Sequence, residues 1–96
     1  MLDIRFTPEA EETYRAVVAQ LQSRWGEKFV DKFESKVEKL LTQIRKAPDL
    51  YPILSDYHEL HRCVIHRNCS LFYNVFDSYI LIVWFWDNRQ QPLFVQ

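Results

Sequence analysis

The chain has 96 residues, of which 48% are hydrophobic and 16% aromatic, and it contains a single glycine. This length and composition predict one globular domain over residues 1–96 and exclude a disordered or low-complexity chain. The formal net charge of -1 excludes the overall basic field that is typical of nucleic-acid-binding proteins, so any such contact would need a local basic patch.

The N-terminus lacks the basic and apolar regions of a secretory signal, because acidic residues follow it at once. The longest apolar run, Ile80 to Trp86, is far shorter than the roughly 20 residues of a membrane span. We therefore expect a cytoplasmic protein that makes no membrane contact.

The first half of the chain predicts a strand and two helices. Leu2, Ile4 and Phe6 alternate with charged residues, as in a half-buried strand. Thr7 and Pro8 are typical of a helix start, and Gly26 of a helix end. Between them runs an apolar stripe at helical spacing that continues to Trp25, formed by Ala10, Tyr14, Val17, Val18 and Leu21.

A second helix follows Gly26 and stops before Pro48. Its apolar stripe consists of Val30, Phe33, Val37, Leu40, Leu41 and Ile44. With so short a break between them, the two helices should form an antiparallel hairpin. Two helices cannot bury both stripes against each other, so a sheet must cover the open side of the hairpin.

The second half predicts a loop and a three-stranded meander. Residues 47–59 contain Pro48 and Pro52 and read as a loop. The strands are Leu60 to His66, Cys69 to Phe76 and Tyr79 to Trp86, with turns at Arg67-Asn68 and Asp77-Ser78. The fold class is thus α+β, in the order β-α-α-β-β-β, with the helical hairpin packed on one face of a mainly antiparallel sheet.

The last strand, Tyr79 to Trp86, is apolar on both faces, which indicates that it is covered twice. The helices cover one face. The second cover is either the chain's own residues 92–96 or a partner protein.

The cysteines and histidines are interpreted as structural. With a turn at Arg67-Asn68, Cys63 would lie opposite Phe72 and Cys69 opposite His66, so the two thiols would not meet and should stay reduced. His58 lies in the loop, and strand alternation predicts that His61 and His66 face opposite sides. We therefore expect ordinary surface or edge histidines and no zinc or other metal.

The sequence gives little support for a hydrolase with a catalytic triad or for an enzyme that binds nucleotides through a glycine-rich loop. Neither a serine-histidine-acid triad nor a phosphate-binding glycine loop can be drawn, since the one glycine ends a helix. The sequence predicts no cofactor.

Basic side chains near the hairpin of strands are the first candidate site. His61, Arg62, His66 and Arg89 would be the catalytic candidates of a metal-free RNase, because arginines can hold phosphates and stabilise the charge of phosphoryl transfer. The alternative is that these arginines are solvated side chains that protect an edge strand. If Cys63 and Ile65 face the helices, then Arg62, Val64 and His66 face outward.

The end of the last strand is the second candidate site. Trp84 and Trp86 share one strand face, with Phe85 on the other, and exposed tryptophans would mark a partner-binding patch. Asp87 and Arg89 either pair within a turn or contact a partner. The partner-binding prediction is Arg62, Val64, Trp84, Trp86, Asp87 and Arg89.

Several motifs together resemble the RelE/ParE toxin superfamily of type II toxin–antitoxin modules, of the plasmid-stabilisation type. They are the Thr-Pro-Glu-Ala helix start at residues 7–10, Arg-Trp-Gly at 24–26, Ala-Pro at 47–48, Cys69 to Val75, and Phe85 to Pro92. The resemblance covers nearly the whole chain. It implies the β-α-α-β-β-β fold, a bacterial host, growth inhibition, and a cognate antitoxin that wraps the toxin with an extended or helical segment.

The family divides by target, since RelE-like members cut mRNA in the ribosome and ParE-like members inhibit DNA gyrase. The nuclease residues that the resemblance implies transfer poorly. Cys69-Ser70 stands where a tyrosine-arginine pair is expected, and two expected lysines fall near His61 and Cys63. Only Arg89 lies near an expected basic residue, and Phe94 stands near the place of a terminal tyrosine.

The resemblance therefore favours a ParE-like toxin that acts by binding a protein such as gyrase, with an antitoxin covering the outer sheet face. The alternatives are a ribosome-dependent mRNA endonuclease and a degenerate, non-toxic interaction module.

Overall fold

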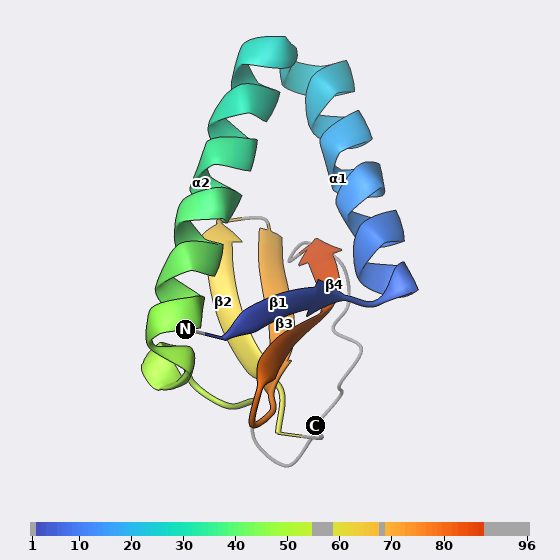
Figure 1. Cartoon of the computed structure of the whole chain (residues 1–96). Coiled ribbons are helices and arrows are strands. Elements are labelled where there is room, and N and C mark those ends of the chain that lie inside the picture. The colour runs from blue at the N-terminus through green and yellow to red at the C-terminus, as the bar shows by residue number, and fades with distance from the viewer. Residues whose placement is uncertain (1, 55–58, 68, 88–96) are drawn as a thin grey trace.

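The computed structural model describes residues 2–54, 59–67 and 69–87. Its elements are β1 (Asp3–Phe6), α1 (Pro8–Trp25), α2 (Glu27–Lys46), the 3-10 helix η1 (Pro48–Leu50), β2 (His61–His66), β3 (Cys69–Val75) and β4 (Tyr79–Asp87). The predicted fold class is confirmed: an N-terminal strand and two helices precede three strands that complete one sheet (Figure 1).

The threonine before α1 fixes both the start of the helix and its position on the sheet. The Thr7 hydroxyl accepts a hydrogen bond from the Ala10 amide at 2.9 Å and donates one to the Val83 carbonyl at 2.6 Å. The first contact satisfies one of the free amides of the first helical turn. The second ties the helix start to β4.

Gly26 is the only residue between the two helices. Its φ of 91° lies in the region that favours glycine, and its amide donates to the Gln22 carbonyl at 3.0 Å. The chain can therefore reverse direction in a very short space. The helices meet at this tip and diverge toward the sheet, as Figure 1 shows.

The sheet has the order β1-β4-β3-β2, with β1 parallel to β4 and the other neighbours antiparallel. The parallel pairing joins Asp3 to Tyr79 and Phe6 to Ile82. The first and last of the described strands thus lie side by side, and β1 and β2 form the two edges. The β3–β4 turn closes with a 2.9 Å bond from the Phe76 amide to the Tyr79 carbonyl.

One hydrophobic core lies between the helices and one face of the sheet. The stripes predicted for the two helices supply its helical side, with Ala10, Phe33, Val37 and Ile44 buried. Its fully buried sheet residues include Leu71, Tyr73, Ile80 and Ile82. Trp25 departs from the predicted stripe, because it is 63% exposed. Trp25 is the last residue of α1, at the tip of the hairpin, where the two helices extend past the strands (Figure 1).

Two register shifts change which residues face the core. In β2 the pairing passes from Val64↔Ser70 to His66↔Cys69, so Ile65 is an extra residue. In β4 the pairing passes from Tyr73↔Ile82 to Phe72↔Trp84, so Val83 is extra. The Phe85 amide, next to the second bulge, donates to Thr13 Oγ1 at 3.0 Å. This hydrogen bond joins α1 to β4 a second time.

Candidate functional site

The structure does not bring together the three nuclease candidates that it describes, His61, Arg62 and His66. His61 is 5% exposed; its ring stacks on Tyr73 at a centroid distance of 4.8 Å, and its Nδ1 lies 2.8 Å from the Tyr51 carbonyl oxygen. His61 therefore lies on the edge strand β2, in line with the prediction of a surface or edge histidine, but it is buried rather than at the surface and holds the loop to the core. His58 and Arg89 lie outside the described residues.

Arg62 and Val64 lie on the outer face of the sheet, as predicted. The Arg62 Nε donates to Ser70 Oγ at 3.2 Å, and Val64, which pairs with Ser70, is 53% exposed. The serine hydroxyl thus holds the guanidinium against the neighbouring strand.

The tryptophans of β4 share this outer face. Trp84 pairs with Phe72, and their rings lie 5.9 Å apart; Trp86 pairs with Ser70. Both tryptophans are half-buried, whereas Phe72 is almost fully buried. Phe85 faces the core, so the predicted division of residues 84–86 between two faces is confirmed. The outer face thus carries the aromatic side chains of Phe72, Trp84 and Trp86 beside Arg62. Residues 92–96, proposed as its second cover, lie outside the described residues.

His66 was predicted to face outward, and this is wrong. The bulge at Ile65 turns the strand, so that His66 pairs with Cys69 and its ring meets the Phe29 ring of α2 at 5.9 Å, edge-on. The same bulge places Leu71, rather than Phe72, opposite Cys63. His61 and His66 therefore lie on the same side of the sheet, at opposite ends of β2.

Asp87 is likewise separated from the tryptophans that precede it. It pairs with Cys69 and lines a pocket of about 360 Å³ between the helical tip and the ends of the strands. We call this the tip pocket; it is lined by Val17, Gln20, Leu21, Arg24, Trp25, Phe29, Phe33, His66, Arg67, Cys69 and Asp87. The predicted partner-binding residues that the structure describes thus divide between the outer face and the tip pocket.

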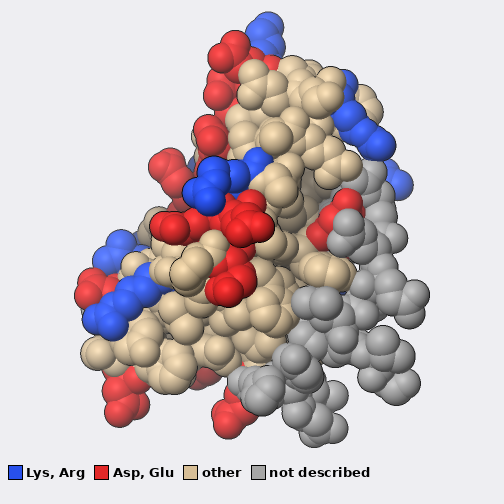
Figure 2. All heavy atoms as spheres, turned by 90° about the vertical axis from the view of Figure 1, so that its right-hand side faces the viewer, with Lys and Arg blue, Asp and Glu red and all other residues tan. Residues whose placement is uncertain are grey.

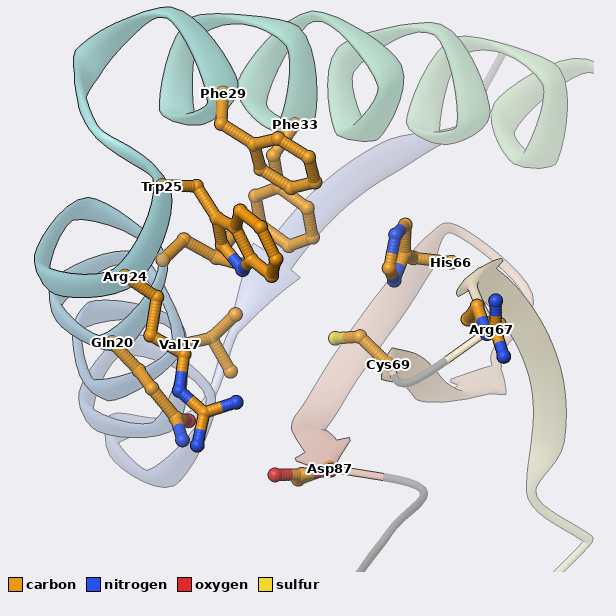
Figure 3. Close-up of a pocket in the computed structure, with 11 residues that line it drawn as sticks. Val17, Gln20, Arg24, Trp25, Phe29, Phe33, His66, Arg67, Cys69 and Asp87 are labelled. Carbon is orange, nitrogen blue, oxygen red and sulfur yellow. The ribbon is translucent and has the colours of Figure 1, made fainter.

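Figure 3 shows how the tip pocket is built. Arg24 and Trp25 come from the end of α1, Phe29 and Phe33 from α2, and His66, Cys69 and Asp87 from the strand ends, and these side chains face one common space. The Trp25 ring stacks on the Phe29 ring at 5.7 Å with an interplanar angle of 27°. The pocket therefore combines an apolar floor with charged groups at its rim.

Sequence reasoning missed most of this pocket. It used Trp25 only as the end of an apolar stripe and, with Arg24, as part of the Arg-Trp-Gly motif; it placed Arg67 in a strand turn and did not consider Phe29. The available signal was the Arg-Trp pair beside the lone glycine, since a tryptophan at a helical tip extends beyond the part of the hairpin that a short sheet can cover. The bulge that brings His66 into the pocket has no comparable sequence signal.

The two cysteines are buried and free, and neither offers a reactive thiolate at neutral pH. The pKa of Cys69 is raised from 9.0 to about 12, mainly by burial of the thiol and to a lesser extent by the nearby carboxylate of Asp87. Burial also raises the pKa of Cys63. The Cys69 thiol is therefore part of the apolar floor of the tip pocket.

These pKa shifts predict that the protein loses stability in alkaline solution. A raised pKa means that the folded chain holds the Cys69 proton between pH 9 and pH 12, where the unfolded chain releases it. The stabilisation is complete below pH 9 and falls by about 1.4 kcal/mol per pH unit above it. Tyr14, Tyr51 and Tyr73 act in the same direction, because burial raises their pKa values above 10.0.

Urea unfolding at pH 8, 9, 10 and 11 measures this loss. Cys69→Ala is the matched control, because it removes one titrating group and should make the decline between pH 9 and pH 10 less steep. An unfolding free energy that stays constant up to pH 11 would contradict the prediction.

The described residues contain no group of three or more His, Cys, Asp or Glu side chains that could hold a metal ion. None of the helices in the described part of the chain is long and apolar enough to cross a membrane. On the face that Figure 2 shows, acidic and basic side chains are interspersed and form no continuous basic surface.

The fold and these surfaces define a class of small α+β proteins in which a helical hairpin packs on one side of a four-stranded mixed sheet. Residues 4–92 match the family described as "ParE toxin of type II toxin-antitoxin system, parDE". The chain belongs to this family, and the resemblance drawn from its motifs is confirmed. No curated protein sequence matches the chain significantly.

Solved structures show the same fold. A chain of the chromosomal ParDE TA system from P. aeruginosa is similar with a TM-score of 0.76 at 13% identity, covering 91% of this chain and 96% of that one. A chain of the YoeB dimer from Staphylococcus aureus has a TM-score of 0.62 at 26% identity, covering 86% of this chain and 92% of that one. A chain of the E. coli DinJ-YafQ toxin-antitoxin complex has a TM-score of 0.62 at 12% identity, covering 92% of this chain and 93% of that one.

Proposed function

We propose that this chain is the toxin of a two-gene bacterial module and that it stops growth by binding an essential protein of the gyrase type. A cognate antitoxin neutralises it by covering the outer sheet face around Arg62, Trp84 and Trp86. The observation that carries the proposal is the ParE family match over residues 4–92. The toxin-antitoxin systems among the structural neighbours support the antitoxin partner.

The positions of the nuclease candidates support binding rather than RNA cleavage. General acid–base cleavage needs proton donors and acceptors within hydrogen-bonding reach of one substrate bond. His61 is buried against Tyr73 at one end of β2, and Arg62 lies on the outer face of the sheet. His66 lies in the tip pocket, at the other end of β2 and on the face opposite to Arg62. These three side chains cannot act on one phosphodiester in the described arrangement.

Expression of the chain alone in a bacterial host tests the proposal, and the expected result is growth arrest that co-expression of the adjacent gene relieves. Normal growth at high soluble yield would contradict it and would favour a non-toxic interaction module. Two further assays separate the mechanisms. Purified toxin should inhibit DNA supercoiling by gyrase, and primer extension on mRNA from arrested cells should show no new cleavage sites. New cleavage sites would overturn the binding mechanism.

A further inference from the structure

The tip pocket has the composition of a protein-binding anchor site. Interface hot spots are enriched in tryptophan and arginine, and here Trp25 and Arg24 stand together at the pocket rim. Trp25 remains 63% exposed although it stacks on Phe29, so much of its surface stays open to a partner. The volume of about 360 Å³ suits one large inserted side chain rather than a folded element.

The floor of the pocket sets the chemistry of that side chain. It is formed by Val17, Leu21, Phe33 and Cys69, and the thiol is held in its neutral form by burial. Such a floor gains from contact with apolar groups and offers a phosphate or a lysine no compensating partner. The inserted side chain is therefore a large apolar one.

The rim sets the charge of the segment that carries this side chain. Figure 3 shows Arg24 from α1 and Arg67 from the β2–β3 turn on different sides of the pocket. Among the described lining residues, Asp87 is the one that carries a carboxylate. Guanidinium groups so placed attract carboxylates that flank an inserted side chain. A nucleic acid fits less well, because Asp87 would repel its phosphates and the chain carries a formal net charge of -1.

We propose that the tip pocket binds an acidic segment of a partner protein, which inserts one large apolar side chain against Trp25 and Phe29 while its flanking carboxylates meet Arg24 and Arg67. This proposal rests on the proposed function for the existence of the biological partner. It adds the chemistry of the segment with which that partner binds. The site is separate from the outer sheet face, so one partner chain that spans both surfaces would be anchored twice.

Synthetic peptides test the proposal on the full-length protein. The probe is a capped peptide with one phenylalanine flanked by aspartates and glutamates; a second peptide carries lysines instead of the acids, a third carries serine instead of phenylalanine, and a single-stranded oligoribonucleotide is the fourth ligand. NMR follows the three tryptophan indole signals, and Trp25→Phe assigns that of Trp25. The acidic phenylalanine peptide should shift the Trp25 signal and bind more tightly than the other ligands.

Charge reversal gives the second arm. R24E/R67E should lower the affinity for the acidic peptide by about tenfold or more, equivalent to about 1.4 kcal/mol, and should raise the affinity for the lysine peptide. K32E is the matched control, since Lys32 is exposed on α2 and does not line the pocket, and it should change neither affinity appreciably. Retention of the acidic peptide by R24E/R67E, no peptide binding at all, or a preference for the lysine peptide or the RNA would overturn the proposal.

These outcomes are independent of the growth assay. If the unmodified chain does not arrest growth but binds the acidic peptide as described, the proposed function fails and the pocket assignment stands. If it arrests growth and shows no such peptide preference, the pocket assignment alone fails.

Discussion

Replacing Phe85 with alanine is expected to lower the free energy of unfolding by about 3–5 kcal/mol. Phe85 is 2% exposed, and its ring meets Tyr14 at 5.0 Å, where α1 crosses β4. Removing the ring leaves a cavity that the two fixed elements cannot close, since Thr7 and Thr13 hold α1 to β4 at the Val83 carbonyl and at the Phe85 amide. A domain of this size has a total stability of roughly 5–15 kcal/mol, so the variant would be near its unfolding threshold.

Urea and thermal unfolding measure this effect, with a fall in the melting temperature of more than about 10 °C. Val64→Ala is the control, because Val64 is 53% exposed and its truncation should change stability by less than about 0.5 kcal/mol. Similar losses in both variants would show that Phe85 is not the central core contact of α1.

Replacing Tyr73 with alanine should destabilise the protein by a similar amount, about 3–5 kcal/mol. The Tyr73 ring is fully buried and stacks on His61, and its hydroxyl donates to the Pro48 carbonyl at 2.7 Å. One side chain thus joins the sheet to η1 and to the residue that anchors the following loop. Its loss should also speed hydrogen exchange at the Arg62 amide, which donates to Pro52 at 3.0 Å.

Tyr73→Phe separates the two contributions, because it keeps the stacked ring and removes only the hydrogen bond. This substitution should lower the free energy of unfolding by about 1 kcal/mol. If Tyr73→Phe were as damaging as Tyr73→Ala, the hydrogen bond to Pro48, rather than the packing of the ring, would dominate.

The fold could be predicted because its signals are local. Thr7 with Pro8, the lone Gly26 and two stripes at helical spacing define the helices from a few residues each, and alternation defines β2 to β4. The parallel partner of β1 was not predicted, since nothing within residues 2–6 specifies a strand more than seventy positions away. Only the packing of the complete chain decides which strand pairs with β1.

The candidate site was predicted less well, and the bulges explain why. Strict alternation along β2 assigns His66 to the face of Arg62, but the one extra residue at Ile65 moves His66 to the helical side. Alternation also takes no account of the tip of the hairpin, where Trp25 is exposed and lines the tip pocket. Arg62 and Val64 precede the bulge in β2, and the alternation of residues 84–86 begins only after the bulge at Val83, so the outer-face positions of Arg62, Val64 and Trp84 were placed correctly.

The pairing of β1 with β4 also has a consequence for synthesis of the protein. The helical hairpin is complete at Lys46, when none of the three later strands has yet been translated. Its apolar stripes then have no sheet to cover them, and β1 has no neighbour until Tyr79–Ile82 emerges from the ribosome. Folding must therefore finish after most of the chain has been made, and contacts so distant in sequence form slowly. A nascent chain therefore cannot complete its sheet until most of its translation is done.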